Sequence, residues 1–207
     1  MANISSFLSK IGEGVKPNMF SVEIPFPAGL DNEPTANSED QKLVNLLCKS
    51  TALPASNLGV IEVPFRGRTV KIAGDRTFDT WSATFFNDKD MKVRGFFEQW
   101  LESINTHEAN NAPLFQPSAT DGYMQNMKVH QLRKDEASPE SPNKLRSYEL
   151  YFAFPTSISQ IDLAYDSNDQ IEEFTVEFQY SYWKALKGGT TGSSQIEIKK
   201  WSFWPDK

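Results

Sequence analysis

The sequence predicts a mainly β fold, namely a β-sandwich or barrel with one flanking α-helix at about residues 88–105. Several long segments alternate apolar and polar residues with the period of a half-buried strand, whereas one segment carries the wider apolar stripe of an amphipathic helix. The chain has 207 residues, of which 39% are hydrophobic and 13% aromatic, and it shows no internal repeat. A chain of this size and composition can bury a substantial core within one domain.

The first part of the chain contains a short amphipathic segment, a strand and a loop. Residues 4–14 fit one or two helical turns that end at a pair of glycines. Their apolar side consists of Ile4, Phe7, Leu8 and Ile11. Residues 19–26 alternate apolar and polar side chains and predict a strand. Residues 27–42 are polar and lack periodicity, so we expect a surface loop there.

Two further strands and a hairpin are expected before the helix. Residues 43–51 and 77–87 have the composition of strands. Residues 58–73 predict a β-hairpin with its turn at 66–68, because alternating segments flank a glycine there.

The predicted helix is the clearest single element. Asn87 and Asp88 are good N-cap residues directly before it. The apolar positions then recur at helical spacing and form one wide stripe. This stripe comprises Val93, Phe96, Phe97, Trp100, Leu101 and Ile104.

The second half of the chain predicts three more strands. They cover residues 123–134, 144–154 and 171–183; a polar loop at 105–121 precedes them, and another at 135–143 joins the first two. The last of these strands alternates over its whole length, which favours an antiparallel sheet with one face on water.

The end of the chain has a different composition. Residues 187–194 are rich in Gly, Ser and Thr, as flexible linkers are, and they precede a strand-like piece at 195–204. We therefore divide the chain into a main domain, 1–183, and a C-terminal linker and extension, 184–207.

Charge and cysteine content exclude several classes of protein. With 21 basic and 27 acidic residues the formal net charge is −6, which argues against tight binding of nucleic acid. A single cysteine, Cys48, excludes an internal disulfide framework. No apolar run is long enough to cross a bilayer, and the start of the chain lacks the pattern of a signal peptide.

No residue pattern predicts catalysis, a metal site or a cofactor. The two histidines, His107 and His130, fall in a predicted loop and a predicted strand, and Cys48 lies in an apolar run typical of an inert, packed thiol. Residues 166–169 lack the glycine and distal glutamate of a calcium loop. Trp201 and Trp204 could stack on a sugar, although an apolar strand docked on protein is the simpler interpretation.

One short motif, Gly74-Asp75-Arg76, lies between two predicted strands. Glycine permits a tight bend, and Asp accepts hydrogen bonds from nearby backbone amides. The residues alone therefore predict a β-turn.

This motif is also part of a family resemblance. The matching segments occur in order from about residue 17 to residue 183, and they are 51–55 (TALPA), 71–81 (KIAGDRTFDTW), 87–88 (ND), 97–100 (FEQW) and 166–183. On these segments the chain resembles the tail tube proteins of contractile-tailed bacteriophages, which are related to type VI secretion and pyocin tubes.

The resemblance implies a structural, non-enzymatic subunit. Six subunits would close into a ring whose sheets join into one wide barrel around a pore, and rings would stack into a tube within a contractile sheath. Expected partners are further copies of the chain, the sheath protein, baseplate and tail terminator proteins and the tape measure protein. DNA would pass through the lumen without specific binding. The expected location is the virion tail, after assembly in the host cytoplasm and without membrane insertion.

Two sets of residues are candidates for the tube's surfaces. The polar face of the 171–183 strand is expected to face water, either as the lumen or as the outer wall; it consists of Glu173, Thr175, Glu177, Gln179 and Ser181. The predicted hairpin, together with the N-terminal arm, is the candidate for ring stacking, with an ordinary internal hairpin as the alternative. Its apolar residues are Val60, Ile61, Val63 and Phe65.

Alternative functions remain open at this stage. A baseplate tube initiator or a secretion-system inner tube would also be structural. A carbohydrate-binding or hydrolytic β-sandwich module is the alternative from another class. The segments 27–42, 105–121, 135–143 and 184–207 depart from the family pattern, so the resemblance implies little about them.

Overall fold

The computed structural model describes residues 3–12, 14–27, 30, 39–110, 122–133 and 144–187. Its elements are α1 (Ile4–Ile11), β1 (Phe20–Glu23), α2 (Glu39–Leu46), β2 (Cys48–Thr51), β3 (Asn57–Phe65), β4 (Arg68–Thr77), β5 (Trp81–Phe86), α3 (Lys92–Ile104), β6 (Gln125–Leu132), β7 (Lys144–Ile158), β8 (Glu173–Gln179) and β9 (Tyr182–Lys187). The mainly β prediction is confirmed.

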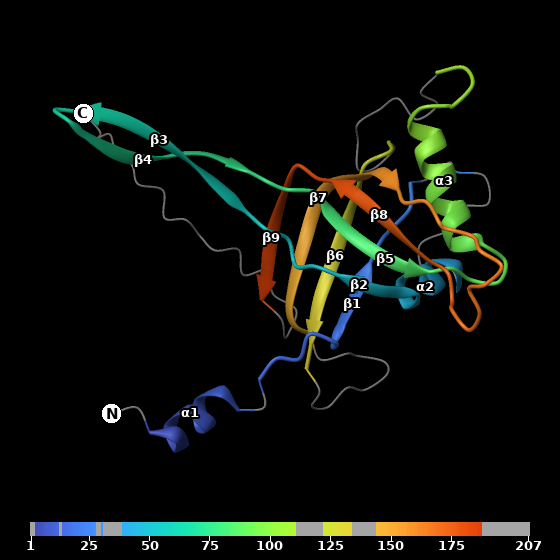
Figure 1. Ribbon diagram of the computed structural model, residues 1–207, viewed down its shortest axis with the longest axis horizontal. Coiled ribbons are helices and arrows are strands. Elements are labelled where there is room, and N and C mark those ends of the chain that lie inside the picture. Colours follow the sequence, from blue (N-terminus) through green and yellow to red (C-terminus); the bar gives the residue numbers. More distant parts are fainter. Residues whose placement is uncertain are drawn as a thin grey trace, which may run out of the picture.

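Seven strands form an antiparallel sheet that is folded into two layers by β7 (Figure 1). The strand order is β1-β6-β7-β8-β5-β2, and β9 pairs alongside β7. As far as Ala153, β7 pairs with β6, and from Phe154 onward it pairs with β8. Between these parts, Phe152 has a left-handed backbone with φ of 56°, and this local twist lets one strand serve both layers.

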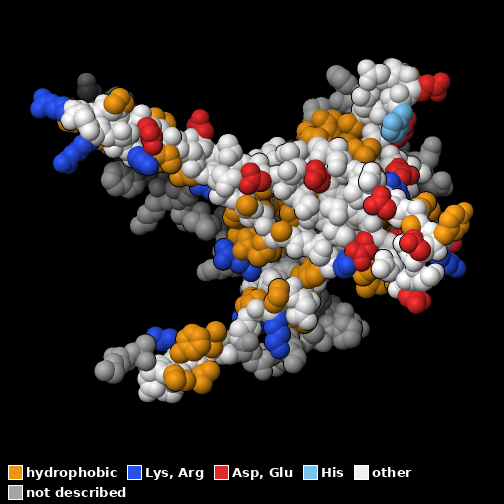
Figure 2. Space-filling view, viewed as in Figure 1, with side chains coloured by type: hydrophobic (Ala, Val, Ile, Leu, Met, Phe, Trp, Pro, Cys, Tyr) orange, Lys and Arg blue, Asp and Glu red, His pale blue; other side chains and the backbone are white. Residues whose placement is uncertain are grey.

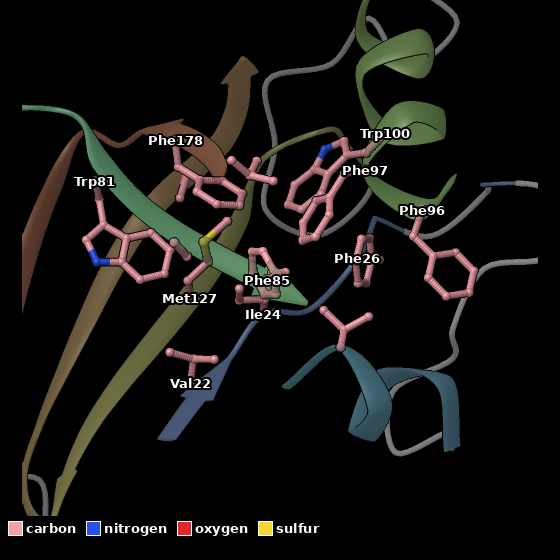
Figure 3. Close-up of a cluster of buried hydrophobic side chains, with 14 of the residues drawn as sticks. Val22, Ile24, Phe26, Trp81, Phe85, Phe96, Phe97, Trp100, Met127 and Phe178 are labelled. Atoms are coloured by element: carbon pink, nitrogen blue, oxygen red, sulfur yellow. The ribbon is translucent and has the colours of Figure 1, made fainter. Parts of the chain in front are cut away.

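The hydrophobic core lies between the two layers and beneath α3 (Figure 3). Phe97 of α3 is fully buried, with its ring centroid 5.0 Å from that of Phe85 on β5 and 5.9 Å from that of Phe178 on β8. Trp100 donates its indole N–H to the Tyr123 carbonyl at 2.8 Å. The predicted helix stripe is therefore the face that closes the core.

Helix α3 begins later than the capping residues predict. Its first residue is Lys92, and the preceding Met91 has φ of 54° and no capping side chain. Asp88 still acts on the helix, because its Oδ1 accepts the Val93 N–H at 3.1 Å. Asn87 instead donates to Glu172. The start was misplaced because the carboxylate reaches the helix over a turn of three further residues.

Helix α2 is an element that the sequence analysis missed. A loop through residue 42 and a strand from residue 43 were expected, but the chain is helical from Glu39 to Leu46 and extended only from Cys48. Tertiary contacts explain the difference: Gln41 donates to the Ile24 carbonyl, Asn45 accepts the Ile24 N–H at 3.0 Å, and Val44 is buried in the core. The expectation of one flanking helix was wrong because α2 also packs on the body, whereas α1 falls within the short helical segment that was expected at residues 4–14.

The predicted strand at 171–183 is two strands. β8 ends at Gln179, and β9 begins at Tyr182 and pairs with β7. Ser181 at the break donates its N–H to the Tyr151 carbonyl at 3.0 Å, which ends the β8 ladder. The predicted 77–87 strand likewise begins only at Trp81.

The proposed boundary at residue 183 falls inside β9. Residues 188–207, with Trp201 and Trp204, lie outside the described residues, as do residues 134–143 and most of 27–38. The division into two parts therefore stays a prediction.

Candidate assembly surfaces

The hairpin β3–β4 is an extended, exposed apolar part of the described chain. It forms a separate two-stranded sheet that projects from the body (Figure 1). All nine residues of β3 are exposed. The four residues predicted for ring stacking are brought together on this strand, each 41–62% exposed; they are Val60, Ile61, Val63 and Phe65.

Apolar side chains lie on both faces of this hairpin, and one of the two faces also carries the ion pair between Glu62 and Lys71. Consecutive residues of a strand point to opposite faces, and Val60 and Ile61 are consecutive. Across the ladder, Ile72 pairs with Ile61 and Val70 pairs with Val63, and both partners are also exposed. Two-stranded hairpins are marginally stable alone in water, and large exposed apolar patches mark interaction sites. The hairpin therefore has the properties of an interface.

The free end of the hairpin carries positive charge. Arg66 and Gly67 form its turn, with φ of 46° and 77°, as the sequence predicts. Arg66 and Arg68 join in no ion pair with the part of the chain that is described, whereas Lys71 pairs with Glu62 at 3.5 Å. Figure 2 shows the Lys and Arg side chains gathered at this end, next to apolar side chains.

The base of the hairpin is tied to the body by polar contacts. Arg76 donates to Ser56 Oγ at 2.9 Å, and Asn57 donates to Asp79 Oδ2 at 2.7 Å. The Trp183 indole donates to the Ala55 carbonyl at 2.9 Å. The sequence does not predict that Trp183 anchors the hairpin, because its hydrogen-bond partner is a backbone carbonyl more than a hundred positions away.

The predicted turn at Gly74, Asp75 and Arg76 is wrong. All three residues lie within β4, and the turn of the hairpin is at Gly67. Gly74 faces Gly59 across the ladder so closely that a Cβ at Gly74 would lie 3.2 Å from the Gly59 carbonyl carbon. The glycines therefore permit a close approach of two backbones, at the point where the register shifts between Leu58 and Val60.

Helix α1 presents a second apolar surface. Asn3 caps it by accepting the Ser5 N–H at 3.4 Å, and none of its residues is buried. The apolar side that was predicted for the N-terminal segment is present as a single stripe. It comprises Ile4, Phe7, Leu8 and Ile11, which are 50–76% exposed.

The outer face of β8 and β5 is polar and rich in hydroxyl groups. Along β8 the side chains alternate between buried and solvent-facing. Thr175 and Thr84 share a hydrogen bond of 3.0 Å across the ladder, and Glu177 pairs in register with Ser82. Glu173 forms an ion pair with Lys49 of β2. Gln179 and Ser181 are also exposed, and Thr175 is half-buried. The assignment of this face to the lumen or the outer wall stays a prediction.

A polar cluster on the other layer is centred on the buried side chains of His130 and Ser147. His130 of β6, only 3% exposed, contacts Ser147 Oγ at 2.7 Å and Glu23 Oε1 at 2.9 Å. Lys144 donates to the same Glu23 oxygen at 2.9 Å. The hydrogen bond with His130, followed by that with Lys144, lowers the pKa of Glu23 to about 2 against desolvation.

This cluster has the residue types of a serine hydrolase relay but not its accessibility. Ser147 is 6% exposed, so a substrate cannot reach its hydroxyl. The cluster ties β1, β6 and β7 together. Its geometry, with every member hydrogen-bonded, is that of a structural network.

Other chemical candidates are weak among the described residues. Burial raises the pKa of the Cys48 thiol to about 12, which keeps it protonated and a poor nucleophile. No group of three or more His, Cys, Asp or Glu side chains in the described ranges could hold a metal ion. No helix there is long and apolar enough to span a membrane.

Comparison with known proteins decides the family. The family model described as phage tail tube protein matches residues 15–186. The chain belongs to the phage tail tube protein family. It is 30% identical over 173 residues to the tail tube protein gp19 of Enterobacteria phage T4, covering 84% of this chain and 93% of that protein. It is 27% identical over 183 residues to the tail tube protein of Serratia phage KSP90, covering 87% and 95%.

Solved structures of low sequence identity share the fold of this tail tube protein. A chain from the sheath/tube terminator of an extracellular contractile injection system superposes with a TM-score of 0.54 at 13% identity, over 83% of this chain and 96% of that one. A chain from the anti-feeding prophage baseplate gives a TM-score of 0.51 at 15% identity, over 82% and 93%. The family match and the two relatives thus support the role of tail tube subunit ahead of the sugar-binding or hydrolytic module.

Proposed function

We propose that six copies of this tail tube protein close into a ring and that these rings stack into the hollow inner tube of a contractile tail. The observation that carries the proposal is the combination of open sheet edges on the body with an apolar hairpin that no described residue covers. The tube would conduct the genome without specific binding. Sheath, baseplate, tail terminator and tape measure proteins would be its further partners.

Open strand edges support ring closure. Within the described ranges, β2 pairs with β5 on one side only, and residues 154–158 of β7 pair only with β8. These are the two ends of the layer that contains β8 and β5. Unpaired N–H and C=O groups favour pairing with another chain. Joining the edges of neighbouring copies would remove them, and a closed ring leaves none.

The hairpin β3–β4 and helix α1 are the proposed contacts between rings. The double variant Val63→Asp, Phe65→Asp should leave rings intact and shorten tubes, because charge opposes burial of these side chains against another ring. A matched control, Leu46→Asp with Met91→Asp, changes two apolar residues that are exposed elsewhere. Tubes of wild-type length from the hairpin variant would show that the assignment is wrong.

The hydroxyl-rich face of β8 and β5 is the proposed lumen. Glu173 is neutralised by Lys49, which leaves Glu177 as a carboxylate outside the ion pairs of this face. A weakly acidic, hydroxyl-lined wall offers phosphates no counterion-releasing contacts, so DNA meets no deep trap along its route. The net charge also disfavours DNA binding, because every copy in a ring carries a formal charge of −6.

A charge reversal tests the lumen. Glu177→Lys should permit tube assembly but lower phage infectivity by about tenfold or more, because six lysines per ring would bind the moving phosphate backbone. The control Glu108→Lys makes the same charge change at an exposed residue after α3. Equal infectivity of the two variants would contradict the lumen assignment.

Electron microscopy of the purified protein tests the proposal as a whole. Negative staining should show hollow rings or tubes with six-fold end views. A monodisperse monomer at all concentrations would contradict it.

A further inference from the structure

A second surface of the molecule is complementary to the hairpin tip. Residues 160–173, which comprise most of the loop between β7 and β8 and the first residue of β8, contain five acidic residues and no Lys or Arg; we refer to this segment as the acidic loop. Asp162, Asp166 and Asp169 take part in no ion pair with the described part of the chain, whereas Glu173 binds Lys49. Figure 2 shows Asp and Glu side chains over the end of the molecule that lies opposite the hairpin.

The acidic loop encloses an open hollow whose lining is mainly polar and includes a few apolar side chains. The hollow measures about 600 Å³ and is bordered by Ile161, Asp162, Leu163, Ala164, Ile171 and Glu172. Leu163 and Ile171 are strongly exposed. Acidic groups thus lie beside Leu163 and Ile171 around an open concavity, and this arrangement is complementary to a tip that carries Phe65 between Pro64 and two arginines.

The two surfaces lie at opposite ends of the molecule's longest dimension (Figure 1). The hairpin tip of one copy therefore cannot reach the acidic loop of the same copy. A contact between these surfaces has to join two copies head to tail. The nine residues of β3 span about 30 Å at about 3.3 Å per residue, so the hairpin can reach well beyond its own subunit. A heterologous contact of this kind repeats without closing, as stacking requires.

We propose that the hairpin tip of one copy docks into the acidic loop of a copy in the adjacent ring. Arg66 and Arg68 lie against Asp162 and Asp166, and Phe65 covers Leu163 and Ile171. The inference rests on the proposed function, since it names the acceptor for the stacking hairpin. Arginine suits this contact because its planar guanidinium pairs with carboxylates and stacks on apolar and aromatic groups.

Charge exchange tests the pairing. Arg66→Glu with Arg68→Glu should shorten tubes at least tenfold, and so should Asp162→Lys with Asp166→Lys, because each places like charges together. The quadruple variant should recover tube length to within about twofold of wild type. The control double Lys89→Glu with Arg133→Glu makes the same charge change at exposed residues, and it should have no effect.

The outcomes separate this inference from the proposed function. If wild type forms no rings, the proposed function fails. If rings form but the quadruple variant does not recover, or either charge double stacks normally, the docking inference is overturned while the ring remains. A third outcome concerns α1. If Asp162→Lys with Asp166→Lys restores the tube length of the Lys10→Glu variant, but not that of the Arg66→Glu, Arg68→Glu variant, then α1 occupies the acidic loop and the inference is again overturned.

Disulfide trapping gives a second readout that does not depend on tube length. In a Cys48→Ser background, Val70→Cys near the tip and Ala164→Cys in the hollow are prepared as two separate proteins. Oxidation of the mixture should give covalent dimers, whereas either protein alone should give none. Absence of dimers from mixtures that stack normally would contradict the contact.

Discussion

The sandwich core and the hairpin β3–β4 use the same residue types in opposite environments. Phe85, Phe178 and Val176 are buried between the two layers, whereas Phe65 and Val63 of the hairpin are exposed. Both regions alternate β-branched and aromatic residues as strands do. The difference teaches that such a pattern predicts a strand, but not whether its apolar side is covered by its own chain or by another copy.

The largest expected effect is the difference in stability loss between a substitution in the sandwich core and one in the hairpin. Phe97→Ala removes a fully buried ring and should cost about 3–5 kcal/mol, which lowers the Tm by about 6–20 °C for a chain of this size. Phe65→Ala should stay within about 0.5 kcal/mol of wild type. Thermal unfolding followed by circular dichroism measures both. Equal losses would show that the hairpin belongs to the folding core.

Removing the hairpin sharpens the same comparison. Replacing residues 59–74 by Asn-Gly should change the free energy of unfolding by less than about 1 kcal/mol, because β3 and β4 pair only with each other and carry no buried side chain. Ring stacking should be lost entirely. Calorimetry and negative-stain imaging report the two properties, and a shortened protein that unfolds or still stacks would refute the separation.

A smaller effect on stability is expected in the body of the molecule, at the Glu23 carboxylate. The pKa of Glu23 is about 2 in the folded protein, against 4.5 for an unperturbed glutamate. The ionised side chain therefore stabilises the fold fully above about pH 4.5, and this stabilisation is lost as the pH falls toward 2. Glu23→Gln should lower the Tm at pH 7 by about 2–4 °C, or about 1 kcal/mol after allowance for solvent screening of this half-exposed side chain.

The pH profile of this variant is the decisive readout. Its Tm deficit relative to wild type should shrink as pH falls below about 4.5. Glu108→Gln, an exposed control, should follow wild type at every pH. A deficit that stays constant down to pH 2 would contradict the assigned pKa.

The smallest expected effect concerns the glycine pair in the hairpin. Gly74→Ala places a methyl group against the Gly59 backbone, so hairpin amides should exchange hydrogen several-fold faster while the Tm of the body stays unchanged. Gly95→Ala in α3, where no atom lies within 4 Å of the added group, should instead stabilise by about 0.5–1 kcal/mol. Slower exchange in the Gly74 variant would show that the two backbones are not closely apposed.

Much of the fold could be predicted from the sequence because its signals are local. The stripe of α3 and the alternation of β1, β6 and β8 are periodic patterns that one segment carries alone. The exposed hairpin was also predicted, since alternation around Gly67 is a local signal. Its role between rings was a hypothesis from exposure and family resemblance, and it stays a prediction.

The elements that sequence reasoning missed depend on distant partners. Helix α2 begins with four polar residues and lacks a complete helical stripe, and contacts of Gln41 and Asn45 with Ile24 hold it. The break between β8 and β9 interrupts no alternation, because its cause is the Tyr151 carbonyl. Gly74 was assigned to a turn since a glycine signals backbone freedom, whereas its true neighbour, Gly59, is known only once the strands pair. For binding, residues 166–169 were considered only as an incomplete calcium loop, because the role proposed for the acidic loop depends on a second copy of the chain.

The shared strand β7 has a mechanical consequence. A sandwich whose layers touch only through side chains can be sheared apart by breaking dispersion contacts. Here the covalent backbone crosses from one layer to the other at Phe152, so a pull on either layer is transmitted along the polypeptide and spread over two hydrogen-bonded ladders. Such a subunit resists delamination under axial force.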